Sequence, residues 1–287
     1  MTFIIHGASG AQGGPVARKL KSEGYSVSAA VRGGQEVPDG IETLAVDLAD
    51  AAALSAAYSG AEGVFVHLPM GDPGSLQRYA DSVAQAVRES KPRKVVISTS
   101  GQIVDQPNSA LQAAPDSPIM RLIEGVSASG VPTAVVAPRL FLENLLLPVV
   151  EGYVRSSGIL RYPLASTMPV SWASHLDVAD VAATLLTGSE VVGVVAVGQL
   201  PALTGDDLAA AFSRHLSRQV SFEALTPEGF GDLIEPLFGK AGAAPVVGLY
   251  SALGAAPDNA IGEERSGQRL LDVQPRSVDQ WLAEVRF

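Results

Sequence analysis

A glycine-rich segment near the start of the chain constrains the fold more than any other feature. It follows a short apolar run at residues 3–6 and reads Gly7-Ala8-Ser9-Gly10-Ala11-Gln12-Gly13. In such a segment Gly7 permits a tight turn, Gly10 lets backbone amides approach a pyrophosphate, and Gly13 allows a helix to pack closely on a strand. We therefore expect a dinucleotide at the N-terminus of the following helix. A glycine-rich turn without a ligand is the alternative.

Short apolar runs and longer helical segments alternate through the first half of the chain. The runs are rich in β-branched residues or alanine, as in strands covered on both faces, and lie at residues 3–6, 26–31, 43–46, 63–67, 94–98 and 133–137. The expected helices lie at residues 13–23, 51–58, 76–90 and 119–129. Gly24, Gly60 and Gly130 stand where three of them should end in left-handed caps. This alternation predicts an α/β fold with a Rossmann-type, doubly wound parallel sheet.

The pattern loosens after residue 140. We expect a helix, an irregular stretch, a second helix and a strand, at residues 141–155, 162–172, 177–186 and 191–197. Mostly helices follow, with a short strand near residues 220–222 and a glycine- and proline-rich region at residues 238–267. The sequence thus predicts three parts: an NAD(P)-binding Rossmann domain over residues 1–150, a return to the sheet at about 175–198, and a small, mostly helical substrate lobe within 151–287.

Composition excludes several classes of function. The chain has 20 Lys and Arg against 30 Asp and Glu, a formal net charge of −10, and no Lys/Arg-rich block. Binding to a nucleic acid backbone would need a local basic patch against this field, so we expect no nucleic acid partner. Cysteine is absent and the four histidines are scattered. We therefore expect no disulfide, no cysteine nucleophile and no metal site.

No segment has the length of a membrane span. The most apolar candidate, residues 140–150, contains Glu143 and Asn144, and crossing a bilayer takes roughly 20 apolar residues. The first residues lack a basic region and a cleavage signal before the glycine segment. We therefore expect a cytoplasmic protein with no membrane partner, whose oligomeric state the sequence leaves open.

Five segments together carry a resemblance to a known family. They are the glycine segment, Val31-Arg32, Asp47-Leu48, residues 60–65 and the run Pro138-Arg139-Leu140-Phe141-Leu142-Glu143-Asn144. In this order, over about residues 2–190, the chain resembles the NmrA-like branch of atypical short-chain dehydrogenases/reductases. That branch includes NADPH-dependent quinone reductases, triphenylmethane dye reductase, isoflavone-reductase relatives and non-catalytic redox sensors. The resemblance therefore implies a fold and a class of cofactor more firmly than an activity.

Arg32 indicates which dinucleotide binds. It lies 19 positions after Gly13, where an NAD-preferring protein carries an acidic residue, and its planar guanidinium suits the 2′-phosphate of NADP(H). An exposed, solvated arginine is the alternative. The resemblance places Asp47 and Leu48 at the adenine, whereas Asp47 serves equally well as the cap of the helix near residue 51. The other expected cofactor contacts are Gly7, Ser9, Gly10, Ala11, Gln12, Gly13, His67, Leu68, Pro69 and Ser98.

The proton donor of ordinary short-chain reductases is missing. Those enzymes use Tyr-x-x-x-Lys, in which the lysine lowers the pKa of the tyrosine, and no tyrosine here is followed by lysine four residues later. Ser100 is a candidate for orienting a carbonyl, although a strand-end serine often only satisfies backbone groups. His175 is a candidate proton donor, and Asp177 is expected to cap the helix that follows it.

Hydride transfer to an electron-poor conjugated acceptor tolerates this loss, because charge spreads over the substrate and the protein supplies chiefly orientation. We expect an apolar substrate pocket lined by Phe141, Tyr162 and Trp172; the alternative is that these residues belong to the ordinary hydrophobic core. Asn144 is expected to offer a hydrogen-bond partner to the substrate in this pocket. The leading hypothesis is an NADPH-dependent reductase of a quinone-like or polycyclic aromatic molecule. The alternatives are a non-catalytic NADP(H)-responsive sensor that binds a protein, and a tailoring enzyme, such as an oxygenase, of aromatic polyketide metabolism.

Overall fold

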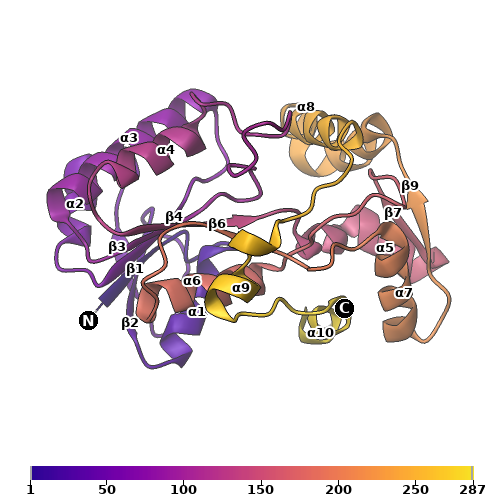
Figure 1. Cartoon of the computed structure of the whole chain (residues 1–287), viewed down its shortest axis with the longest axis horizontal. Coiled ribbons are helices and arrows are strands. Elements are labelled where there is room, and N and C mark those ends of the chain that lie inside the picture. Colours follow the sequence, from indigo (N-terminus) through magenta and orange to yellow (C-terminus); the bar gives the residue numbers. More distant parts are fainter. Residues whose placement is uncertain (1, 286) are drawn as a thin grey trace.

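Seven parallel strands form the centre of the structure (Figure 1), a computed structural model that describes residues 2–285 and 287 and leaves Met1 and Arg286 outside. The strand order is β3-β2-β1-β4-β5-β6-β8, and each neighbouring pair is parallel. The strands are β1 Thr2–His6, β2 Ser26–Val31, β3 Glu42–Ala45, β4 Gly63–His67, β5 Val95–Ser98, β6 Thr133–Pro138 and β8 Gly193–Val197. Because the order reverses between β1 and β4, ligands are expected beyond the carboxyl ends of these strands.

Helices cover both faces of this sheet. On one face α1 (Gly13–Ser22) and α6 (His175–Thr187) bury apolar residues such as Val16 and Leu185 against the strands. On the other face α2 (Ala51–Tyr58), α3 (Pro73–Ser90) and α4 (Pro118–Ser127) do the same with Leu54, Val83 and Leu122. Burial on both sides explains why the strands are short runs of Val, Ile and Ala rather than alternating sequences.

A second apolar core lies beyond the carboxyl end of β6, around Trp172, Phe212 and Trp281. It is enclosed by the 3₁₀ turn η1 (Leu142–Leu146), α5 (Pro148–Ser157), β7 (Ile159–Tyr162), α7 (Gly205–Leu216), β9 (Ser221–Ala224), α8 (Pro227–Gly254) and α10 (Val278–Val285). Strands β7 and β9 pair in parallel. The short η2 (Glu263–Arg265) and α9 (Gly267–Leu271) contact β8. This lobe occupies one end of the molecule (Figure 1).

The predicted fold class is confirmed, with two differences in the second half. The helix expected over residues 141–155 is divided, because Pro148 starts a new helix after η1. The glycine- and proline-rich region at residues 238–267, for which no helix was specified, contains most of α8, which bends at Gly239 (φ 71°, ψ 166°) and continues. The left-handed ends expected at three glycines are confirmed, with φ of 71° to 87° at Gly24, Gly60 and Gly130. The boundary at residue 150 stays a prediction.

Gly13 is the point at which α1 approaches β1 most closely. A Cβ atom at this position would lie 2.2 Å from the carbonyl oxygen of His6 and 2.4 Å from that of Gly7. Both neighbours are backbone atoms, so they cannot turn aside as a flexible side chain would. A side chain at position 13 therefore forces α1 away from the sheet.

We predict that Gly13→Ala lowers the free energy of unfolding by about 1–3 kcal/mol, the usual cost of overpacking. The matched change Gly152→Ala, at an exposed position within α5 with no atom within 4 Å of the new Cβ, should raise it by about 0.5–1 kcal/mol, because alanine suits a helix better than glycine. Urea unfolding of the two variants and the parent measures both effects. A Gly13→Ala protein as stable as the parent contradicts the close approach.

Candidate functional site

A cleft opens where the strand order reverses, beyond the carboxyl ends of β1, β2 and β4. Doubly wound sheets bind their ligands at this place. Residues from the start of α3, including Ser75 and Tyr79, line it as well. Its lining includes eight of the expected cofactor contacts: Gly7, Ser9, Gly10, Arg32, Asp47, Leu48, His67 and Pro69.

The glycine segment forms a tight turn over this cleft. Gly7 has φ of 61°, and a Cβ there would lie 2.3 Å from His67 Nε2, so both the backbone and the neighbouring side chain require glycine. The amide of Gly10 donates to the carbonyl oxygen of Gly7 at 2.8 Å. A Cβ at Gly10 would meet only that oxygen, at 3.3 Å. The chain thus leaves a hollow at Gly10 that a ligand can fill.

The N-terminus of α1 lacks a side-chain cap. Gln12 occupies the cap position, but its amide turns away: Nε2 donates to Ser100 Oγ at 3.0 Å, and Oε1 accepts from Ser98 Oγ at 2.8 Å. By contrast, Asp50 caps α2 through its carboxylate. Gly14 donates its amide to the carbonyl oxygen of Gly10 at 3.0 Å, and Pro15 has no amide hydrogen. The amide of Gly13 is therefore the one in this first turn that is left for an anion. This end of the helix and the hollow at Gly10 fit the pyrophosphate of a dinucleotide.

The expected contacts outside the cleft lining surround it. Ala11 and Gly13 flank Gln12 in the turn, Leu68 follows β4, and Ser98 ends β5. Gln12 and Ser98 thus connect the glycine turn to β5 and to Ser100, which has φ of 55°. These residues lie next to the cleft without lining it. Their contact with a cofactor stays a prediction.

Arg32 and Asp47 lie at the strand ends that border the cleft. Arg32 is exposed immediately after β2. Asp47 accepts a hydrogen bond from the amide of Ala49 at 2.9 Å. The alternative role of Asp47 as a helix cap is wrong, because Asp50 accepts from the amides of Ala52 and Ala53 at the start of α2. Asp47 therefore remains free for the predicted adenine contact.

The histidines near the cleft are neutral at pH 7. Burial, with His67 as the second cause, lowers the pKa of His6 to about 3, and its Nε2 bonds the hydroxyl of Tyr58 at 2.7 Å. Burial also lowers the pKa of His67, which donates from Nδ1 to the carbonyl oxygen of Leu68 at 3.2 Å. Burial lowers the pKa of His175 as well, against an opposing effect of Glu143. None of the three is a ready proton donor.

His175 lies beside the site rather than in its lining. Its ring packs on Phe141, with 4.1 Å between the centroids. It begins α6, which Ser174 and Asp177 cap through reciprocal hydrogen bonds. Asp177 thus takes part in the cap as predicted, but from within the first turn, and the N-cap residue itself is Ser174. The role of His175 as a proton donor stays a prediction that its lowered pKa does not favour.

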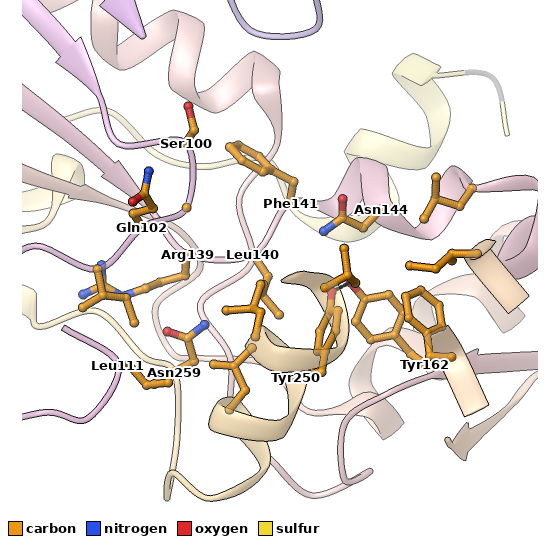
Figure 2. A pocket seen from close by; sticks show the side chains of 18 of the residues that line it. Ser100, Gln102, Leu111, Arg139, Leu140, Phe141, Asn144, Tyr162, Tyr250 and Asn259 are labelled. Carbon is orange, nitrogen blue, oxygen red and sulfur yellow. Dashed lines mark hydrogen bonds between the residues drawn. The ribbon is translucent and has the colours of Figure 1, made fainter. Parts of the chain in front are cut away.

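A second cavity of about 560 Å³ adjoins the cleft, and Met70 lines both. The loops after β5 and β6, the turn η1 and strand β7 form part of its wall (Figure 2). Helix α8 supplies eight more lining residues: Phe230, Ile234, Phe238, Gly242, Val246, Leu249, Tyr250 and Leu253. A mostly apolar cavity of this size suits a small organic molecule.

Four of the five residues predicted for this region line the cavity: Ser100, Phe141, Asn144 and Tyr162. The fifth, Trp172, does not. Its side chain is buried in the core of the lobe and packs edge-on against Tyr162, with 5.4 Å between the ring centroids. Trp172 therefore does not line this cavity, and its contact with a substrate stays a prediction that its burial does not favour.

The sequence analysis missed Tyr250, whose hydroxyl hydrogen-bonds that of Tyr162. Tyr250 belongs to the glycine- and proline-rich region at residues 238–267, for which the sequence specified no helix. A spacing of four that runs through residues 230, 234, 238, 242, 246 and 250 was the available signal for a helix face.

Arg139 was missed as well. Its guanidinium is fully buried and pairs through Nη2 with both carboxylate oxygens of Asp105, at 2.9 and 3.0 Å. Asp105 is only 6% exposed. The charge of Arg139 is therefore balanced within the protein, and the wall that it helps to form carries no net charge from this pair.

Two properties of the described residues concern other kinds of site. Within residues 2–285 and 287, no group of three or more His, Asp or Glu side chains is placed to hold a metal ion. Over the same part of the chain, no helix is long and apolar enough to cross a membrane. The cytoplasmic location stays a prediction.

Comparisons with known proteins agree with this geometry. The NmrA-like family is matched over residues 1–267. A NAD(P)H azoreductase of Xenophilus azovorans is 31% identical over 238 residues, which cover 79% of this chain and 78% of the relative. The crystal structure of Citrobacter sp. triphenylmethane reductase complexed with NADP(H) has a TM-score of 0.80 over 99% of both chains, at 18% identity. The NADPH-dependent quinone oxidoreductase of Escherichia coli complexed with NADPH has a TM-score of 0.74 over 100% of both chains, also at 18% identity.

We predict that Gly10→Val abolishes dinucleotide binding, because the isopropyl group fills the hollow at Gly10 next to the N-terminus of α1. Titration calorimetry with NADPH measures the effect, and thermal unfolding checks that the variant is folded. Gly262→Val is the control, since Gly262 is exposed and a Cβ there has no atom within 4 Å. Unchanged NADPH affinity in the Gly10→Val protein would show that the segment is only a structural turn.

Proposed function

Since this chain belongs to the NmrA-like family and is related to an NAD(P)H-dependent reductase, we propose that it transfers hydride from NADPH to a quinone-like or polycyclic aromatic acceptor. One observation carries the proposal: the apolar cavity of about 560 Å³ adjoins the dinucleotide cleft and shares Met70 with it. An acceptor in the cavity lies next to the cofactor, and hydride transfer requires that contact.

Arg32 supports NADPH as the cofactor. It is exposed at the end of β2 and lines the cleft, where the ribose of the adenosine half of a dinucleotide lies in folds of this kind. A guanidinium at this position offers two parallel donors to a 2′-phosphate. The carboxylate that would hold a free 2′-hydroxyl is absent from this position.

The lining of the cavity suits a flat conjugated acceptor. Phe141 and Tyr162 offer aromatic surface, and Asn144 of η1 adds an amide to the same lining. When bound, NADPH supplies the hydride. The residues of this chain then orient the acceptor against the cofactor, and the apolar wall of α8 keeps water away.

The absence of Tyr-x-x-x-Lys favours the same class of acceptor. A ketone that receives hydride becomes a localised alkoxide and needs an acid beside it, whereas a reduced quinone spreads its charge over the ring. The relatives reported above fit this pattern, because azo dyes, triphenylmethane dyes and quinones are all extended conjugated molecules. None of these relatives is described as an oxygenase or as a polyketide enzyme, so the tailoring alternative gains no support from them.

We predict that the protein binds NADPH more tightly than NADH and that Arg32→Ala removes most of the difference. Loss of a charge-assisted contact to phosphate should cost about 1.5–3 kcal/mol of binding free energy. Calorimetric titration of parent and variant with both nucleotides measures the preference. Arg88→Ala, which removes an exposed arginine at the end of α3, should leave it unchanged. Equal affinities for NADPH and NADH in the parent would refute the assignment.

We also predict that NADPH is oxidised with a panel of quinones and far more slowly with small ketones. Asn144→Ala should lower kcat/KM for quinones by about 3- to 10-fold, the usual effect of one lost hydrogen bond. Asn108→Ala is the control, because Asn108 is exposed and lies outside the cavity lining. Efficient ketone reduction contradicts the proposed mechanism. Nucleotide binding with no turnover on any quinone favours the sensor.

A further inference from the structure

The proposed reaction ends with a proton on an oxygen of the acceptor, and the histidines near the cleft are neutral. We propose that the hydroxyls of Tyr162 and Tyr250 form the acid for this step: they bond the acceptor oxygen farthest from the nicotinamide and give it a proton. The inference rests on the proposed function. It narrows the substrate class to acceptors in which a carbonyl oxygen is conjugated with a distant atom that takes the hydride.

The two tyrosines reach the same point from separate elements. Tyr162 ends β7, and Tyr250 lies in the second half of α8. Their hydroxyls hydrogen-bond each other, and both residues line the cavity together with Asn144 (Figure 2). The two hydroxyls thus lie together in a wall that is mostly apolar.

One of the two hydroxyl hydrogens is not used in the hydrogen bond between the tyrosines. Each phenol carries one O–H group, and the bond between them uses only one of the two. Both side chains are buried, at 0% and 3% exposure. A buried hydroxyl that lacks an acceptor is costly, so an acceptor oxygen in the cavity gains a hydrogen bond that the protein has already prepared.

Both phenols keep their protons at any ordinary pH. Burial raises the pKa of Tyr162 to about 12, outweighing the opposite effects of Tyr250 and Asn144. Burial also raises the pKa of Tyr250 well above its usual value. The pair therefore acts as a neutral donor, which stabilises negative charge as it develops on a substrate oxygen.

The position of the pair determines which acceptors it serves. Ser100 follows β5 on the nucleotide side of the cavity, and Figure 2 places the tyrosine pair well away from it, beyond Phe141 and Asn144. A small ketone develops its charge next to the carbon that takes the hydride, out of reach of the pair. A quinone or a comparable conjugated molecule carries the charge to its far oxygen.

The atoms and electrons balance in this scheme. The acceptor takes a hydride at its near end, and an electron pair moves through its conjugated bonds to the far oxygen. The O–H bond of one tyrosine breaks, and its proton joins that oxygen. The tyrosinate recovers a proton from the second tyrosine, which water restores. In total, NADPH, one acceptor and one proton give NADP⁺ and the dihydro product.

The test uses Tyr162→Phe, Tyr250→Phe and the double variant, which keep the packed rings and remove only hydroxyls. The single-turnover rate of NADPH oxidation by a quinone should fall by about 100-fold or more in the double variant, the usual contribution of a positioned acid. Tyr153→Phe is the control, because Tyr153 is exposed on α5 and outside the cavity lining. A double variant that reacts at the parent rate overturns the inference.

A structural role would not change the pH profile, so the profile is the second measurement. The rate of the parent should be flat between about pH 6 and 8, because both phenols stay protonated. In the double variant solvent must supply the proton, and the rate should fall as pH rises, by up to about tenfold per pH unit. A flat profile in the double variant overturns the inference.

Binding of 4-nitrophenol separates this inference from the proposed function, because it needs no turnover. At a pH where the probe is ionised, its oxygen takes the place of the reduced acceptor oxygen. The parent should bind it about tenfold more tightly than the double variant, and the absorbance of the bound phenolate should shift. Equal affinity overturns the acid pair even in an active reductase. Tighter parent binding in a protein that reduces no quinone supports the pair and rejects the proposed function.

Discussion

The approach of α1 to β1 at Gly13 is the contact on which the site depends. Because a helix axis can come this close only where a side chain is absent, the first turn of α1 reaches the carboxyl edge of the sheet. The same turn places Gly7 against His67, which ties β1 to β4 at the point where the strand order reverses. The hollow at Gly10 and the amide of Gly13 beside it follow from this one packing arrangement.

The nucleotide half was predictable because its determinants are local in sequence. The glycine segment, the strand runs and the capping glycines each act within a few residues, so spacing alone located them. Asp47 shows the limit of such reasoning. Asp47 and Asp50 lie three positions apart, and the sequence alone does not show which of the two caps the helix. Only the fold shows that Asp50 takes the cap and Asp47 turns to the cleft.

The substrate side was predictable only in part, because its residues meet through tertiary packing. Phe141 and Asn144 were found through a continuous motif, and both line the cavity. Trp172 and Tyr162 looked alike as aromatic residues, but one packs behind the other. Tyr250 lies 88 positions from its partner Tyr162, within a stretch where glycine and proline hide the helical period, so no local pattern joins the two.

The position of helix α8 has a consequence for how the two pockets can change in evolution. One continuous segment supplies eight of the residues around the cavity and none of those around the dinucleotide cleft. Substitutions in this segment reshape the space open to an acceptor, while the glycine turn and Arg32 stay as they are. The bend at Gly239 adds a point where the angle between the two halves of the helix can change. Under the proposed function, substrate range therefore changes through α8 without substitution of the residues around the dinucleotide cleft.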